Sequence, residues 1–106
     1  MGARRILVAN ELASYRQTLV LVIREMRPHV EVFEAASESL EREIRRLRPD
    51  LVICSRVTFT IKQAVANWVE LYPEFKPYST FYINGQHRAK REVELSDLLA
   101  LCASPP

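Results

Sequence analysis

Polar residues whose side chains could take part in binding or catalysis follow the two most apolar short runs of the chain. Asn10 and Glu11 come directly after residues 6–9, and Ser55 comes directly after residues 51–54, a run that itself ends in Cys54. A carboxylate can help to hold a cation. A hydroxyl or a thiol can act as a nucleophile when a neighbouring base or a lowered pKa activates it. The chemistry open to this chain therefore depends on whether these residues meet in the fold.

The immediate surroundings of these residues favour no catalysis. Ser55 has neither a GxSxG context nor a neighbouring histidine, so serine hydrolase chemistry is not expected. Cys54 lies inside an apolar run, which is typical of a buried and inert thiol. The chain has no CxxC motif, and His29 and His87 are far apart, so we expect no metal site and no cofactor.

Four short segments have the pattern of strands. Residues 6–9 and 51–54 are continuous apolar runs that predict buried strands. Residues 30–35 alternate between apolar and acidic types, which predicts a strand at a sheet edge. Residues 79–83 predict a fourth strand, which ends at the turn pair Asn84-Gly85.

Between the expected strands, apolar residues recur at helical spacing. This periodicity predicts helices over about 14–26, 40–48, 60–71 and 96–102. The helix at 40–48 carries arginines interleaved with glutamates, which indicates a solvated, salt-bridged surface. In the helix at 60–71, Trp68 is expected to face the core.

The alternation of strands and helices predicts an α/β fold with a mostly parallel sheet of about four strands. Right-handed crossovers favour a doubly wound arrangement in the order 2-1-3-4, with helices on both faces. We expect one domain over 1–106, of which 103–106 is a frayed tail. In this order the carboxyl ends of the first and third strands are neighbours, where such sheets bind ligands.

The composition limits the classes of partner. The chain has 106 residues, of which 48% are hydrophobic, and this excludes an intrinsically disordered chain. The net charge of +2, from 15 basic and 13 acidic residues, does not predict a nucleic-acid partner. No run approaches the roughly 18 apolar residues of a membrane span, and no signal peptide is recognised. Two cysteines in apolar runs predict reduced thiols and a cytoplasmic location.

Three segments carry a resemblance to a known family. Arg4-Arg5-Ile6-Leu7-Val8-Ala9-Asn10-Glu11, Leu47-Arg48-Pro49-Asp50-Leu51-Val52-Ile53 and Glu94-Leu95-Ser96-Asp97-Leu98-Leu99-Ala100 are similar to runs in receiver domains of bacterial two-component response regulators. The resemblance extends over most of the chain. It implies a flavodoxin-like fold, a cytoplasmic role in signal transduction and a pocket in which an aspartate is phosphorylated.

The residues of that pocket depart from the receiver pattern. The acidic pair that holds Mg²⁺ in receivers aligns with Asn10 and Glu11, and the phosphoacceptor aspartate aligns with Ser55. Asn84 is the nearest polar substitute for the receiver Ser/Thr, and Arg91 aligns with the receiver lysine. A serine hydroxyl is a weaker nucleophile than a carboxylate at neutral pH. The resemblance therefore implies a degenerate phosphoacceptor pocket made of these five residues.

The chain is also too short for a complete receiver. Between the strand at 79–83 and the last helix, a helix and a strand of receivers are missing. Their absence predicts an exposed strand edge, which invites pairing with another chain. We expect an interaction surface that includes Thr80, Tyr82, Arg88 and Lys90. The partner would be another protein or a second copy of this chain, joined through the edge of the fourth strand.

Two functions of different class follow. The first is a receiver-like regulatory protein-interaction domain, not an enzyme, that acts without phosphorylation. The alternative is a small phosphocarrier or a Cys/Ser-dependent enzyme that uses Cys54, Ser55 and Glu11 at the carboxyl ends of the first and third strands. A third and weaker hypothesis is a nucleic-acid accessory module that uses Arg88 and Arg91, with binding that falls steeply with salt.

Overall fold

Six strands form one sheet in the computed structural model, which describes residues 4–73 and 76–103. The strands are β1 (Arg5–Ala9), β2 (Glu31–Glu34), β3 (Leu51–Cys54), β4 (Trp68–Glu70), β5 (Ser79–Ile83) and β6 (Gln86–Lys90). The helices are α1 (Ala13–Met26), the 3₁₀ turn η1 (Ser37–Ser39), α2 (Leu40–Leu47), α3 (Phe59–Ala64) and α4 (Leu95–Ala103). The order of the strands in the sheet is β2-β1-β3-β4-β5-β6.

The first four strands of this order run parallel to one another. β1 lies between β2 and β3, with Ile6 opposite Val32 on one side and opposite Leu51 on the other. β3 pairs in turn with β4, where Ile53 faces Val69. All four residues of β3 are buried, which explains its continuous apolar sequence, because a strand covered by helices on both faces has no polar side.

The last two strands reverse direction. β5 is antiparallel to β4, and β6 is antiparallel to β5. The β5–β6 hairpin turns at Asn84 and Gly85, whose φ angles are +52° and +81°. Two successive residues with positive φ are typical of the two-residue turn that Asn-Gly sequences favour.

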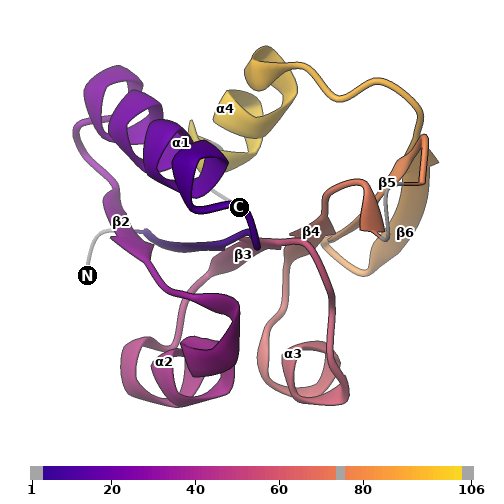
Figure 1. Cartoon of the computed structure of the whole chain (residues 1–106), viewed down its shortest axis with the longest axis horizontal. Coiled ribbons are helices and arrows are strands. Elements are labelled where there is room, and N and C mark those ends of the chain that lie inside the picture. Colours follow the sequence, from indigo (N-terminus) through magenta and orange to yellow (C-terminus); the bar gives the residue numbers. More distant parts are fainter. Residues whose placement is uncertain (1–3, 74–75, 104–106) are drawn as a thin grey trace.

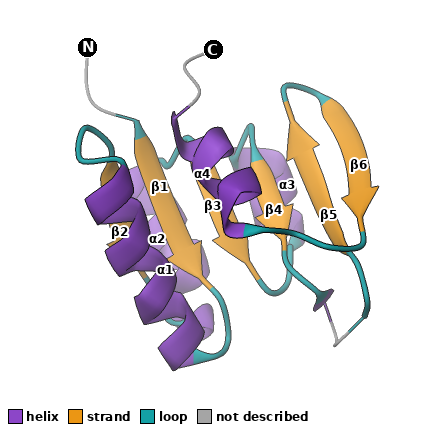
Figure 2. Ribbon diagram, turned by 90° about the horizontal axis from the view of Figure 1, so that it is seen from above, coloured by secondary structure: helices purple, strands orange, loops and turns teal. Residues whose placement is uncertain are grey.

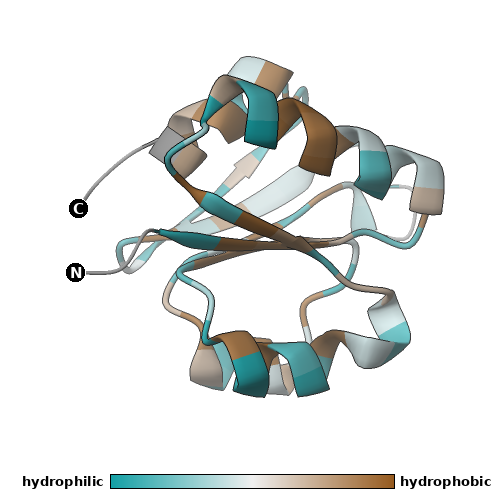
Figure 3. Ribbon diagram, turned by 90° about the vertical axis from the view of Figure 1, so that its left-hand side faces the viewer, coloured by the Kyte–Doolittle hydropathy of each residue, from teal (hydrophilic) through white to brown (hydrophobic). Residues whose placement is uncertain are grey.

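The helices cover the sheet in two layers. α1 and α4 lie on one face, and α2 and α3 lie on the other (Figure 1). Figure 3 shows mainly hydrophobic strands between two layers of helices in which hydrophobic and hydrophilic residues alternate. Each layer encloses its own core: one contains Ile6, Ile23 and Leu98, and the other contains Leu7, Ile44 and Trp68.

The predicted four-stranded, flavodoxin-like sheet is wrong. Residues 68–70, expected within a helix, form β4, which is inserted between β3 and the strand at 79–83. The latter strand is therefore the fifth and is antiparallel, and residues 86–90 add a sixth (Figure 2). The chain can reverse here because a two-residue turn joins β5 to β6, and residues 71–78, which separate β4 from β5, are fewer than the dozen or more that a parallel crossover needs.

The expected helix at 60–71 ends early. The Thr58 hydroxyl oxygen accepts a hydrogen bond from the N–H of Ile61 and starts α3, but Val65 already has extended backbone angles (φ −120°, ψ 129°). Trp68 and Val69 then hydrogen-bond as a strand between β3 and β5. Aromatic and β-branched residues suit such a position, and the tertiary pairing overrides the helical spacing.

Two further expectations from the sequence are a frayed C-terminal tail and the absence of a membrane span. Of the tail expected at 103–106, residues 104–106 lie outside the described residues, and Ala103 is the last residue of α4. The longest helix, α1, has 14 residues, whereas a bilayer span needs about 20. Within the described part of the chain, no helix has the length and apolar character to cross a membrane.

Candidate functional site

The carboxyl ends of β1 and β3 bring Glu11 and Ser55 into contact. The backbone N–H of Glu11 donates a hydrogen bond to the Ser55 hydroxyl oxygen over 3.0 Å. Ala9 and Cys54 are register partners at the ends of the two strands, so the residues that follow them meet at the same edge. The structure thus brings together these two of the five residues proposed for the degenerate pocket.

Asn10 lies between these strand ends and is almost completely buried, with 3% of its surface exposed. Its backbone carbonyl accepts a hydrogen bond from Arg16, and Arg16 also pairs with Glu34 over 2.8 Å. The side-chain oxygen of Asn10 is buried without a hydrogen-bond partner among the described residues. Asn10 therefore contributes to packing and to backbone contacts, whereas Glu11 is exposed to solvent.

Cys54 has the properties of an inert core residue. It is 1% exposed, and its sulfur lies 3.6 Å from the carbonyl oxygen of Val69. Burial, helped by the negative charge of Glu70, raises the pKa of the Cys54 thiol to about 12. The thiolate that would act as a nucleophile is therefore absent at neutral pH.

Glu70 is a further carboxylate near the carboxyl ends of β3 and β4, and the sequence did not predict it there. It is the register partner of Cys54 across β3 and β4. One carboxylate oxygen accepts the N–H of Val57 over 2.7 Å, and the other accepts the hydroxyl of Thr80 over 3.3 Å. Glu70 thus holds the loop after β3 against β5. Its strand was expected to be helical, so no local pattern placed it here.

The structure separates Asn84 and Arg91 from the Glu11–Ser55 contact. Because β5 is antiparallel to β4, Asn84 lies at the opposite end of the strands from Glu11 and Ser55. There its N–H donates a hydrogen bond to the side-chain oxygen of Asn67 over 2.9 Å. Arg91 follows β6, three strands away from β3, and is exposed. The structure therefore does not bring all five residues into one pocket: the antiparallel direction of β5 separates Asn84, and the intervening strands β4 and β5 separate Arg91.

The expected interaction surface is also rearranged. Thr80 and Tyr82 belong to β5, which is paired on both sides, so the edge of that strand is covered. Tyr82 stacks on Trp68 with ring centroids 5.6 Å apart. Arg88 and Lys90 lie on the exposed edge strand β6, where Lys90 pairs with Asp97 over 2.8 Å. The exposed edge is therefore the polar strand β6, because the chain continues into a hairpin.

An apolar groove lies between α1 and the segment that leads into α4. Its volume is about 280 Å³, and it is lined by Tyr15, Thr18, Leu19, Val22, Val93, Leu95 and Leu98. Two of these side chains are large and conspicuously exposed, Tyr15 at 42% and Leu95 at 44%. The hydroxyl oxygen of Tyr72 accepts the N–H of Val93 over 2.9 Å and fixes one wall. We call this the α1–α4 groove.

Three exposed carboxylates are close in sequence to residues that line the α1–α4 groove. Glu92 and Glu94 flank Val93, and Glu25 lies one helical turn from Val22 on α1. All three are exposed, and none forms an ion pair within 4–73 and 76–103. The residues beside the apolar lining therefore carry three carboxylates and one exposed arginine, Arg91, which precedes Glu92.

The comparisons give no relative from which to transfer a function. No protein-family model, no curated protein and no solved structure matches this chain. Across the residues that the structure describes, no group of three or more His, Cys, Asp or Glu side chains is placed to hold a metal ion. The function of this chain is therefore inferred from the contacts of its own residues.

Proposed function

We propose that this chain is a regulatory protein-interaction domain that acts without phosphorylation and binds its partner in the α1–α4 groove. The main support for this proposal is the groove itself, because Tyr15 and Leu95 are exposed beside an apolar cavity. Tyrosine and apolar side chains around a pocket are typical of the anchoring centre of a protein interface. The receiver resemblance of the segments around β1 and β3 supports a role in signal transduction.

The carboxylates next to the lining residues of the groove indicate the chemistry of the partner. Exposed carboxylates at Glu25, Glu92 and Glu94 favour a partner with lysine or arginine beside the apolar side chains that it inserts. Pairing of two copies through β6 is disfavoured, because charged side chains on an edge strand, here Arg88 and Lys90, protect a sheet edge from pairing. We therefore propose a separate protein with a basic, amphipathic binding segment.

The contact between Glu11 and Ser55 supports the independence from phosphorylation. The Ser55 hydroxyl occupies the acceptor position implied by the resemblance, and it accepts a backbone hydrogen bond. The described residues place no histidine beside it to act as a base. Without such activation a serine hydroxyl does not compete with the carboxylate that receivers use.

The alternative of a phosphocarrier or a Cys/Ser enzyme finds no supporting observation. The Cys54 thiol stays protonated at neutral pH and is buried. Neither of the two cavities described here is lined by Cys54, Ser55 or Glu11. A nucleic-acid module likewise finds no support beyond the two exposed arginines on which that hypothesis is based, Arg88 and Arg91.

The first test is a pair of charge variants with a photocrosslinking side chain at position 15. Thr18→Lys places a positive charge in the groove, and Gln63→Lys adds the same charge on α3, in the opposite layer. We expect one partner to crosslink, and Thr18→Lys to weaken its binding at least about tenfold, while Gln63→Lys leaves it unchanged. Equal effects of both variants, or crosslinks to a second copy alone, would overturn the proposal.

The second test addresses phosphorylation directly. We expect the intact mass of the protein to stay unchanged after incubation with acetyl phosphate and Mg²⁺. A stoichiometric phosphoryl adduct would contradict the proposal. The acid or base lability of that adduct would then distinguish a carboxylate from Ser55 or Cys54 as the acceptor.

A further inference from the structure

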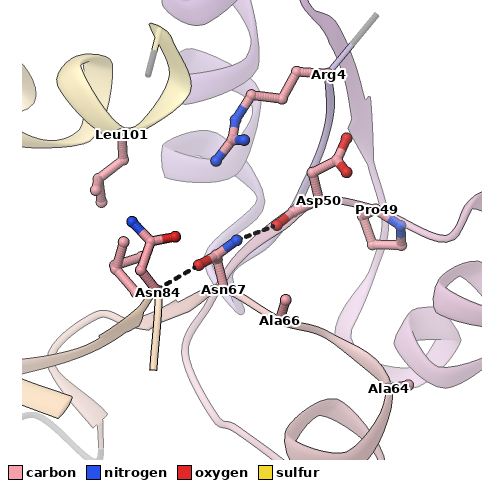
Figure 4. A pocket seen from close by; sticks show the side chains of 9 residues that line it. Arg4, Pro49, Asp50, Ala64, Ala66, Asn67, Asn84 and Leu101 are labelled. Atoms are coloured by element: carbon pink, nitrogen blue, oxygen red, sulfur yellow. Dashed lines mark hydrogen bonds between the residues drawn. The ribbon is translucent and has the colours of Figure 1, made fainter. Parts of the chain in front are cut away.

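A second cavity lies at the opposite edge of the sheet from the Glu11–Ser55 contact. It has a volume of about 290 Å³, between the starts of β1 and β3, the approach to β4, the β5–β6 turn and the end of α4. Arg4, Asn84 and Leu101 point into the same space from three different elements (Figure 4). We call it the Arg4 cavity.

The guanidinium of Arg4 lacks a partner in this cavity. Its Nε atom is buried and has no hydrogen-bond acceptor within 4–73 and 76–103, and no described carboxylate lies within ion-pair distance. Neighbouring arginines are satisfied: Arg5 donates to the carbonyl of Leu47, and Arg27 donates to that of Leu99. A buried donor without an acceptor is costly, and the guanidinium of Arg4 therefore retains hydrogen-bonding capacity that the described residues do not use.

The nearby thiol does not neutralise this charge. Burial raises the pKa of Cys102 to about 11, although the charges of Arg4 and Arg27 oppose the rise. Cys102 is therefore a neutral thiol at physiological pH. Arg4 keeps its full positive charge, because an arginine does not lose its proton in a protein.

Asn84 faces Arg4 from a rigid support. Asn67 donates its side-chain N–H to the carbonyl of Asp50 over 3.2 Å, and its oxygen accepts the N–H of Asn84 over 2.9 Å. These two bonds clamp the β5–β6 turn against the start of β3 (Figure 4). The side-chain amide of Asn84 makes no hydrogen bond to a described residue and can donate to a ligand beside Arg4.

The charges and the lining define the ligand class. Arg4 and Asp50 cancel in net charge, which disfavours a dianion such as phosphate, whereas a single carboxylate needs only the guanidinium fork and one amide donor. Ile83, Leu101 and Pro49 supply apolar wall for a tail. The volume is at the lower limit of ligand pockets, which favours a small molecule. We propose that the Arg4 cavity binds the carboxylate of a small apolar monocarboxylic acid.

The test uses butyrate and benzoate as probes on the full chain, with inorganic phosphate as the comparison anion. In ¹H–¹⁵N spectra we expect both carboxylates to shift the Arg4 Nε–H and Asn84 side-chain signals at millimolar concentration, and phosphate to leave them in place. Equal shifts with phosphate, or shifts confined to other residues, would overturn the proposal. An acetylated peptide with a C-terminal leucine is a third probe. If it binds as tightly as benzoate, the ligand of this carboxylate site would be the C-terminus of a peptide and not a small molecule.

Charge-matched variants separate the site from its surroundings. Arg4→Gln and Asn84→Asp are expected to weaken benzoate binding at least about tenfold, the second by placing a carboxylate where the amide donor stood. Arg48→Gln removes the same charge from an exposed residue outside the lining and should leave binding unchanged. Unchanged binding in folded Arg4→Gln would refute the site. The Thr18→Lys variant of the α1–α4 groove should bind benzoate normally, so the two proposals fail independently.

Discussion

The backbone nitrogen of Glu11 and the hydroxyl oxygen of Ser55 lie 3.0 Å apart and join the loop after β1 to the end of β3. This is one hydrogen bond at a partly exposed position, and it involves no charged group. We expect Ser55→Ala to keep the fold and to lower the free energy of unfolding by about 1 kcal/mol in urea denaturation. Partner binding should not change, since the α1–α4 groove does not include Ser55. A loss of partner binding by folded Ser55→Ala would contradict the assignment.

The two buried cysteines predict how stability depends on alkaline pH. The ordinary pKa of a thiol here is 9.0, and burial raises that of Cys54 to about 12 and that of Cys102 to about 11. Above pH 9 the unfolded chain releases protons that the folded chain retains, so the free energy of unfolding falls with rising pH. It should be insensitive to these thiols below pH 9. Urea unfolding at a series of pH values measures this slope.

A cysteine variant provides the control for that slope. Cys54→Ala is less stable at every pH because it leaves a cavity, but it should show a shallower decline above pH 9. The comparison concerns the slope alone, so the loss from the cavity does not obscure it. An unaltered slope would show that tyrosines and lysines, not Cys54, cause the decline. Native Cys54 should also resist thiol-labelling reagents at pH 7.

The stacked pair of Trp68 and Tyr82 joins β4 to β5. Trp68 is 6% exposed, and the two rings are nearly parallel, with an interplanar angle of 16°. We expect Trp68→Ala to cost about 3–5 kcal/mol of stability. A double-mutant cycle with Tyr82→Ala should give a coupling of about 0.5–1.5 kcal/mol from the aromatic contact. A coupling near zero would show that the stacking adds nothing beyond burial.

Gly85 tests the hairpin that completes the sheet. Its φ is +81°, but a Cβ added there meets no atom within 4 Å, so only the backbone conformation penalises a side chain. Gly85→Ala should therefore lower the free energy of unfolding by about 1–2 kcal/mol. Hydrogen exchange should accelerate first in β5 and β6. Exchange that accelerates equally throughout the sheet would contradict a local effect at the turn.

Local patterns in the sequence predicted three of the four parallel strands, β1, β2 and β3, and the helix α1. The apolar runs at 6–9 and 51–54 correspond to β1 and β3, and the helical period at 14–26 corresponds to α1. These elements are readable because burial on both faces, or on one helical face, imposes a repeat on neighbouring residues. The contact of Glu11 with Ser55 follows from two adjacent parallel strands.

Tertiary pairing decided the other end of the sheet. Val65, Trp68 and Val69 have a spacing that fits a helix, yet Trp68 and Val69 complete their hydrogen bonds with β3 and β5. All five residues of β6 are exposed, so no hydrophobic repeat marks the strand, and only its pairing with β5 defines it. The direction of β5 then moved Asn84 to the opposite edge.

The two candidate binding sites belong to the tertiary structure alone. The α1–α4 groove joins residues near position 18 to residues near 95, and the Arg4 cavity joins positions 4, 50, 84 and 101. Neither set has a spacing that could be recognised along the chain. Sequence determines burial and local conformation through neighbouring residues, whereas a cavity depends on distant segments that meet only when the sheet is complete.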